Sequence, residues 1–208
     1  QKMMIKQRWT ILKKRLNLLD GIITHCLEIY SSIRYWTQDE SRFGLKTITR
    51  RWITLKKVKP IVKVQWSFEA FYLYGIVEPL TGELMIENYD RVNTENFQQF
   101  LNDFSQKYPK DFHVVQTDNA RFHCSNDLIM PDNVMLLYQP PHSPQVNPSE
   151  QLWQWSKGEI SNKLFTGIDH LKTTLSDLFK SKPKEFFASL TSRNFILCAL
   201  QKLVCCQL

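Results

Sequence analysis

The chain has 208 residues, of which 43% are hydrophobic, and this is enough for one globular domain, or one domain with an appendage. Its formal net charge is +7 and its pI is near 9.1. The five cysteines form no Cys-x-x-Cys pair and are odd in number, so the sequence suggests neither a zinc ribbon nor a disulfide framework. No apolar run approaches the roughly 18 residues of a membrane span, and no signal peptide opens the chain. We therefore expect a basic cytoplasmic protein with reduced thiols and no membrane partner.

The positive charge is concentrated in two stretches without an acidic residue. Residues 1–15 and 41–68 together hold 14 of the 27 Lys and Arg residues. Such a distribution is expected of a surface that binds a polyanion, although a solvated basic face remains the alternative. The cations that we expect to contact DNA lie in the second stretch and near the acids described below: Arg42, Lys46, Arg50, Arg51, Lys56, Lys57, Arg121 and Lys157.

The first half of the chain predicts one helix and then three strands. Apolar residues at alternating steps of four and three predict a helix over residues 3–19 with a basic back. Residues 33–43 read as a strand that carries Asp39, and the runs 61–78 and 83–89 read as two more strands. The turn at residues 79–82 separates the last two runs, so we expect three consecutive antiparallel strands.

The second half alternates helices and strands. We expect a helix from Thr94 without a capping partner, strands over 112–116 and 134–138, and a helix from Asn147 to about Leu164. Residues 168–180 and 185–204 also read as helices. This order predicts an α/β fold of the ribonuclease H-like type, in which a mixed sheet of three antiparallel strands followed by αβ units is flanked by helices. The tight turn disfavours a fully parallel sheet.

Three acids on these elements indicate a divalent-metal site. Asp39 lies within a strand, Asp118 follows a strand that we expect to run parallel to it, and Glu150 lies in the first turn of a helix. The three carboxylates can converge at the carboxyl end of the sheet, where two Mg²⁺ ions would assist phosphodiester chemistry.

Each acid also has an ordinary structural interpretation. Asp39, followed by Glu40, can be an edge-strand charge, and Asp118 with Asn119 can form a turn that bonds its own backbone. Glu150 can reach back to Asn147 in a helix cap. The joint placement of the three acids favours the metal site over three separate coincidences.

Polar residues flank the predicted site. Lys157 shares one helix stripe with Glu150, which suits a phosphate contact, while a solvated lysine is the alternative. His123 and His142 can position phosphate or water, or pack within their loops. Neither has a Cys or His partner at zinc-ligand spacing.

Three blocks of the sequence stand out: residues 36–44 (WTQDESRFG), 117–123 (TDNARFH) and 140–153 (PPHSPQVNPSEQLW). They resemble the catalytic blocks of mariner-like DDE transposases, and most of all those of the bacterial insertion-sequence branch. The resemblance covers roughly residues 31–165. It implies a ribonuclease H-like core that uses two Mg²⁺ or Mn²⁺ ions to cut double-stranded DNA at transposon ends and to join the 3′ hydroxyl to target DNA.

By matching position, the resemblance makes Asp39, Asp118 and Glu150 the catalytic, metal-binding triad. It further implies that Asn119 shapes the turn beside the second acid and that Asn147 caps the helix of the third. It also implies a homodimer in the DNA complex. Two alternatives stay open: a relic that binds DNA without cutting it, and a ribonuclease H-like nuclease that acts on another nucleic acid.

The chain departs from the family pattern at three points. The 31 residues between Asp118 and Glu150 are slightly fewer than is usual, and His142 stands where a tyrosine is usual. Members also carry a helix-turn-helix region before the first acid, where this chain has only a basic helix. We therefore expect residues 1–30 to be a lead-in from a missing recognition region, 31–165 the catalytic domain, and 166–208 a helical tail.

Overall fold

The structure, a computed structural model, describes most of the chain between the two terminal regions. The described residues are 10, 25–26, 28–50, 53–57, 59, 61–141 and 143–192. The helix predicted over residues 3–19 falls outside them except for Thr10, as do Arg51, His142 and the end of the last predicted helix.

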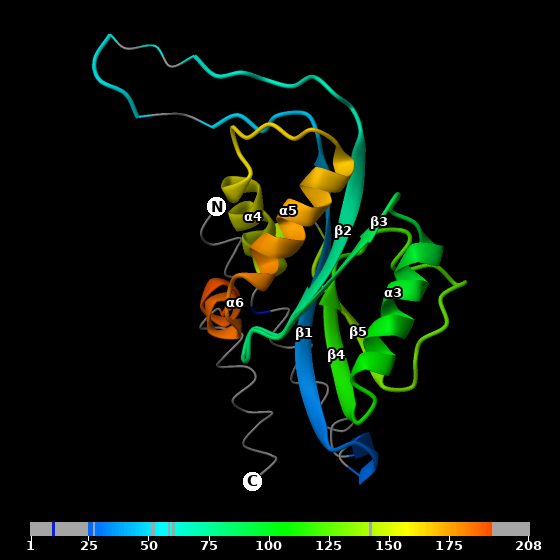
Figure 1. The fold of residues 1–208 in the computed structure, drawn as a ribbon. Helices are drawn as coiled ribbons and strands as arrows, with labels where there is room; N and C mark the ends of the chain where they lie inside the picture. The colour runs from blue at the N-terminus through cyan, green and yellow to red at the C-terminus, as the bar shows by residue number, and fades with distance from the viewer. Residues whose placement is uncertain are drawn as a thin grey trace.

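Five strands form one mixed sheet (Figure 1). The strands are β1 (Ser32–Gly44), β2 (Ala70–Val77), β3 (Leu84–Tyr89), β4 (Asp111–Thr117) and β5 (Val134–Tyr138), in the order β3-β2-β1-β4-β5. β2 pairs antiparallel with both β1 and β3, whereas β4 is parallel to β1 and to β5. The predicted trio of antiparallel strands, followed by parallel strands, is therefore confirmed.

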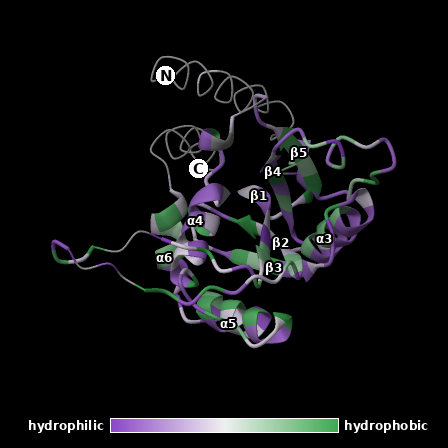
Figure 2. Cartoon of the chain, turned by 90° about the horizontal axis from the view of Figure 1, so that it is seen from above, coloured by the Kyte–Doolittle hydropathy of each residue, from purple (hydrophilic) through white to green (hydrophobic). Residues whose placement is uncertain are grey.

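Helices cover both faces of this sheet. The helix α3 (Thr94–Lys107) packs on one face, while α4 (Ser149–Glu159), α5 (Ile168–Lys180) and α6 (Lys184–Thr191) pack on the other (Figure 2). A short 3₁₀ turn, η1 (Pro144–Val146), precedes α4. Among the described residues, no helix is long and apolar enough to cross a membrane.

The strand pleat decides which side chains enter each layer. On β1, Trp36 joins the core beneath α3, and Phe43 joins the core beneath α4, α5 and α6. Because successive side chains alternate between the faces of a strand, odd-numbered residues of β1 share the α4 face. The pleat therefore directs Asp39 toward α4 and its neighbour Glu40 toward α3.

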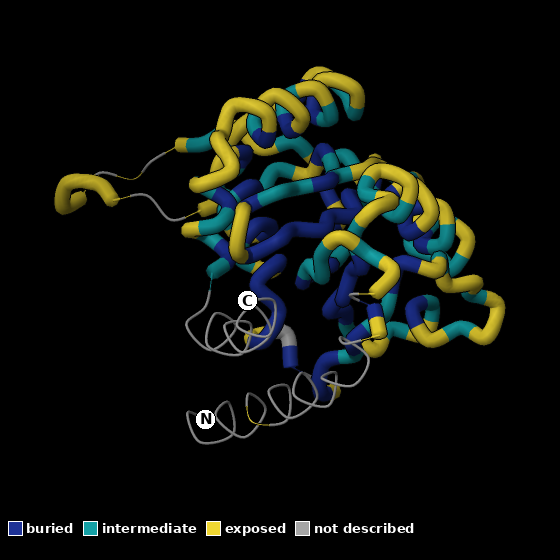
Figure 3. The backbone as a smooth tube through the Cα atoms, turned by 90° about the horizontal axis from the view of Figure 1, so that it is seen from below, coloured by how far each residue is buried: buried dark blue, intermediate teal, exposed yellow. Residues whose placement is uncertain are grey.

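The first boundary that differs from the prediction is that of the second strand. Only Ala70–Val77 of the predicted run 61–78 is strand, and residues 45–69 instead form an arm that projects from the sheet (Figure 1). Two backbone hydrogen bonds, from Leu45 to Glu69 and from Thr47 to Gln65, close its base. Ile61 and Trp66 are exposed, so these apolar side chains of the predicted strand do not enter the core (Figure 3).

Two helix boundaries also differ. The side chain of Asn93 accepts a hydrogen bond from the Asn96 amide at 2.9 Å, so α3 does have a cap, one residue before Thr94. α4 ends at Glu159 instead of Leu164, because Asn162 takes a left-handed conformation with φ of 59°.

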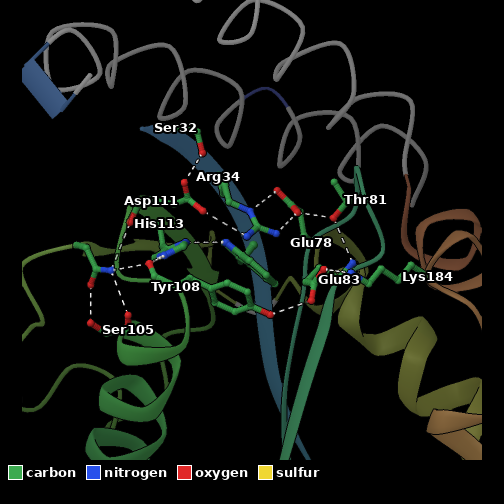
Figure 4. A network of polar contacts seen from close by, with 12 residues as sticks. Ser32, Arg34, Glu78, Thr81, Glu83, Ser105, Tyr108, Asp111, His113 and Lys184 are labelled. Carbon is green, nitrogen blue, oxygen red and sulfur yellow. Dashed lines mark hydrogen bonds and ion pairs between the residues drawn. The ribbon is translucent and has the colours of Figure 1, made fainter. Parts of the chain in front are cut away.

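A polar network ties together the end of the sheet at which β4 begins (Figure 4). The guanidinium of Arg34 on β1 donates to Glu78 at 2.6 Å and to Asp111 at 3.5 Å. It also stacks over the rings of Trp36 and Tyr108. These contacts join β1, β4 and the turn between β2 and β3.

Candidate active site

The three predicted acids line one pocket of about 370 Å³ at the end of the sheet where β4 finishes. They come from three different elements, since Asp39 lies on β1, Asp118 follows β4 and Glu150 begins α4. The complete lining is Asp39, Asp118, Asn119, Ala120, Gln139, Pro140, Pro141, Ser143, Asn147 and Glu150.

The parallel pairing of β1 with β4 brings the first two acids together. Thr37 lies opposite Gln116, so β4 ends beside the middle of β1 and Asp118 follows at the level of Asp39. In this way the sheet joins residues that are far apart in the sequence.

The start of α4 is fastened directly to β1. The side-chain amide of Asn147 donates to the backbone carbonyl of Gln38 at 2.9 Å, and the hydroxyl of Ser149 donates to that of Thr37 at 2.9 Å. Asn147 also accepts from the Ser149 amide at 3.1 Å, but the N-cap of α4 is Pro148 and has no capping side chain, so the predicted start of the helix and its cap at Asn147 are wrong. The carboxylate of Glu150 makes no hydrogen bond to the described residues, so the capping interpretation does not hold there and the carboxylate faces the pocket.

The electrostatics of the pocket disfavour three ionised carboxylates without a cation. Burial, together with the charges of Glu40, Glu150 and Asp118, raises the pKa of Asp39 well above its usual range. Burial also raises the pKa of Glu150, although the charge of Lys157 opposes this. A cation within the pocket would relieve both effects.

Asp118 differs from the other two acids because a buried histidine holds it. Nδ1 of His123 lies 2.7 Å from Oδ1 of Asp118, and Nε2 lies 3.1 Å from Oε1 of Glu40. Burial opposes the charge on His123, but the hydrogen bonds with Asp118 and Glu40 raise its pKa to about 9. The hydrogen bond with His123 in turn lowers the pKa of Asp118. The two carboxylates thus favour the protonated form of His123.

Residues 34–172, about two thirds of the chain, match the family described as DDE superfamily endonuclease. The chain belongs to this superfamily. The protein y4pE/y4sA of Sinorhizobium fredii is 32% identical to this chain over 104 residues, which cover 49% of this chain and 77% of that protein.

Solved structures of Mos1 transposase share the fold. The Mos1 paired-end complex with the left transposon end has a TM-score of 0.64 at 18% identity, over 89% of this chain and 58% of that one. The Mos1 catalytic domain has a TM-score of 0.59 at 16% identity, over 93% of this chain and 92% of that one. The ribonuclease H-like fold and the likeness to mariner-like DDE transposases are confirmed, and the chain spans 58% of the Mos1 chain in the complex.

The three carboxylates of the pocket suit a hard divalent cation. Carboxylates are the protein ligands that Mg²⁺ prefers, and an ion that keeps several waters needs only one or two of them. Within the described part of the chain, no three His, Cys, Asp or Glu side chains are placed to hold one ion together. The chemistry of the three acids, and not their spacing, is therefore what suits the predicted metals.

Lys157 interacts electrostatically with two of the acids. Its half-buried ammonium lies 5.5 Å from the centre of the Phe43 ring. Burial lowers the pKa of Lys157, while the charges of Glu150 and Asp39 raise it. The lysine thus lies within electrostatic reach of two predicted metal ligands.

The other predicted DNA contacts lie elsewhere. Arg50 donates to the Gln154 carbonyl at 3.2 Å, next to Gly158, so it fastens the arm to α4. Arg42 donates to the Phe68 carbonyl, and Lys46 stacks over Trp66 within the arm. Lys56, Lys57 and Arg121 are exposed.

Three features of the site were not expected from the sequence. Glu40 interacts with His123 on the opposite face of β1 from Asp39, which its position next to Asp39 in the sequence does not reveal. A tryptophan on the apolar side of a helix is typical of the core, yet Nε1 of Trp153 donates to Asp39 at 3.1 Å. The amide of Asn119 donates to the Gln139 carbonyl at 2.6 Å and so fixes the loop after β5. The alternation of side chains along a strand could have predicted that Glu40 lies on the face opposite Asp39.

Proposed function

We propose that this DDE endonuclease is the catalytic domain of a bacterial insertion-sequence transposase, which cuts and joins double-stranded DNA during cut-and-paste transposition in the cytoplasm. The observation that supports the proposal most is the delivery of Asp39, Asp118 and Glu150 from three elements into one pocket. Mos1 paired-end complexes with Mn and with Mg are among the structures that this chain resembles, which supports the same metals here.

In the proposed reaction, Asp39, Asp118 and Glu150 hold two Mg²⁺ or Mn²⁺ ions. When bound, these ions activate the attacking oxygen and stabilise the leaving one. His123 keeps Asp118 ionised through the hydrogen bond at its Nδ1. Lys157 is the side chain that we assign to a DNA phosphate next to the scissile bond, and the basic arm contacts the backbone farther away.

Nicking of supercoiled plasmid with Mg²⁺ or Mn²⁺ tests the proposal. We expect the wild-type chain to nick the plasmid and Asp118→Asn to lose this activity. Asp103→Asn is the matched control, because Asp103 is an exposed aspartate on α3. DNA binding is measured in parallel for all three proteins.

Two results would contradict the proposal. Equal DNA binding by all three proteins without nicking by any would favour the relic that binds DNA but does not cut it. Cleavage of an RNA–DNA hybrid in preference to duplex DNA would favour a ribonuclease H-like nuclease with another substrate.

We further propose that the protein acts as a homodimer and that the arm contributes to the contact between the copies. Ile53, Leu55, Ile61, Trp66 and Phe68 on the arm are all more than 70% exposed, which is an unusual amount of apolar surface in contact with solvent. We expect Ile53→Ser with Ile61→Ser to shift the protein on DNA from dimer to monomer in analytical ultracentrifugation. An unchanged mass would exclude the arm as the dimer contact.

A further inference from the structure

The hydrogen-bond acceptor of the Trp153 indole is a carboxylate of the pocket. The indole is 3% exposed, and its Nε1 donates to Oδ2 of Asp39 at 3.1 Å. A buried indole N–H needs an acceptor, but a structural one suffices. The indole of Trp36, on the other face of the same strand, donates to Nδ1 of His113, which lies outside the pocket.

The sheet leaves a space that fits this indole. Gly75 on β2 lies directly opposite Asp39 on β1. A Cβ atom at Gly75 would lie 2.6 Å from Cη2 and 2.8 Å from Cζ2 of Trp153. The six-membered part of the indole therefore rests on the glycine backbone, and any larger residue there would displace the ring from Asp39.

The same helix carries Glu150 and Trp153. Residues three apart lie on neighbouring positions of one helix face, so the fastening of Asn147 and Ser149 to β1 places both side chains at once. Phe43 packs edge-on against the indole, with ring centres 6.1 Å apart, and limits its rotation. The position of α4 thus sets the orientation of Asp39 as well as that of Glu150.

We propose that Trp153 is a positioning residue, which orients the carboxylate of Asp39 for a divalent cation through its indole N–H, in a space that Gly75 keeps open. This inference rests on the proposed function, since it assigns Asp39 to a metal ion. One carboxylate lone pair is used by the indole, and the remaining ones stay available to the ion. Partners of this kind typically change metal affinity by about 10- to 100-fold when they are removed.

The test measures Mn²⁺ binding without DNA, by the electron paramagnetic resonance signal of free Mn²⁺. Trp153→Phe keeps a ring in the core but removes the N–H, and we expect it to weaken Mn²⁺ binding by about tenfold. Gly75→Ala acts from the other side of the contact and should weaken binding in the same way. In nicking assays both variants should lower kcat and leave the KM for plasmid unchanged.

Trp155→Phe is the matched control on the same helix. Trp155 packs against Phe179, Phe186 and Phe187, away from Asp39, so the same substitution there should leave Mn²⁺ binding unchanged. The indole resonances of the wild-type protein provide a measurement that needs no folded variant. On titration with Mg²⁺, the Trp153 indole N–H should shift and the Trp155 indole N–H should not.

The outcomes separate this inference from the proposed function. Wild-type-like Mn²⁺ binding by Trp153→Phe, or a Trp153 indole resonance that ignores Mg²⁺, would overturn the positioning role while leaving the metal site intact. A wild-type protein that binds neither ion would overturn both the positioning role and the proposed metal site. Weakening by Trp155→Phe equal to that by Trp153→Phe would show a general packing effect and would also overturn the role.

Discussion

The carboxylates near the two ends of β4 have opposite electrostatic environments. Where β4 begins, Arg34 bonds Asp111 and Glu78, and Lys184 pairs with Glu83 (Figure 4). Although burial opposes it, the hydrogen bonds from Lys184 and Tyr108 lower the pKa of Glu83.

Where β4 ends, His123 pairs with Asp118, but among the described residues no ion pair neutralises Asp39 or Glu150. The pKa values of Asp39 and Glu150 are raised, and burial is the first cause in both cases. The described residues nevertheless include no buried side-chain nitrogen or oxygen without a hydrogen-bond partner. This end of the sheet therefore has an excess of negative charge, although its described, buried polar side-chain atoms all have hydrogen-bond partners. The acids at the start of β4 are paired with Arg34 and Lys184, which suits a structural role. Asp39 and Glu150 at the other end are suited to binding a cation from solution.

The largest expected effect comes from Asp39→Asn. Loss of a metal-binding carboxylate removes several kcal/mol of transition-state stabilisation, so nicking should fall by about a thousandfold. The unfolding free energy without metal should instead rise by about 1 kcal/mol, because the substitution removes a buried charge that its neighbours repel. Urea denaturation in EDTA and plasmid nicking measure the two effects. Destabilisation by this variant would contradict our account of the pocket.

The opposite pattern is expected at the other end of β4. Glu78→Gln leaves the largely buried guanidinium of Arg34 without its nearest carboxylate, at a cost of about 3 kcal/mol. The site is far from the proposed chemistry, so nicking per folded molecule should be unchanged. Urea denaturation together with nicking at low temperature checks both points. A loss of nicking without a loss of stability would show that the two ends are coupled.

The pH dependence of stability distinguishes the histidine at one end from the arginine at the other. The folded pKa of His123, about 9, lies above its ordinary value of 6.5. Its contribution is therefore fully present below pH 6.5 and is lost as the pH rises to about 9. In EDTA the unfolding free energy should fall over this window by on the order of 2 kcal/mol, through loss of the charge facing Asp118 and Glu40.

Substitution of the histidine isolates this effect. His123→Gln should remove the fall between pH 6.5 and 9, as measured by urea denaturation at a series of pH values. His170→Gln, which changes an exposed histidine on α5, should keep it. A wild-type stability that is flat across the window would show that His123 is neutral.

The sequence was informative where a local pattern decides the structure. The spacing of apolar residues placed β5 and α5 at their observed bounds, and the ends of strands placed Asp39 and Asp118 at one edge of the sheet. The catalytic and metal-binding roles of the residues, and the domain boundaries, stay predictions.

The features that the sequence did not reveal depend on contacts between distant segments. The arm has strand-like composition, but its described residues form no strand and pair only at the base. Glu150 satisfies the capping pattern as well as it fits a metal site, and only the attachment of Asn147 to Gln38 separates the two. Trp153 reads as a core residue until Gly75 and Asp39 are brought to it by the pairing of β1 with β2.

The smallest expected effect concerns Lys157, which interacts electrostatically with Glu150 and Asp39. Lys157 lies on the helix of Glu150, and the charges of Glu150 and Asp39 act on it. In the proposed complex, the ammonium of Lys157 contacts a DNA phosphate in place of these acids. Lys157→Met should therefore weaken DNA binding about threefold and lower the slope of log affinity against log salt concentration by about one.

The same substitution should act on the metal in the opposite direction. Removal of a positive charge near Asp39 and Glu150 should make Mn²⁺ binding slightly tighter, because the lysine no longer competes for the acids. Lys163→Met, at an exposed lysine after α4, should change neither measurement. Weaker DNA binding with tighter Mn²⁺ binding would place Lys157 between the acids and the phosphate, whereas a parallel loss of both would show that it only supports the fold of the pocket.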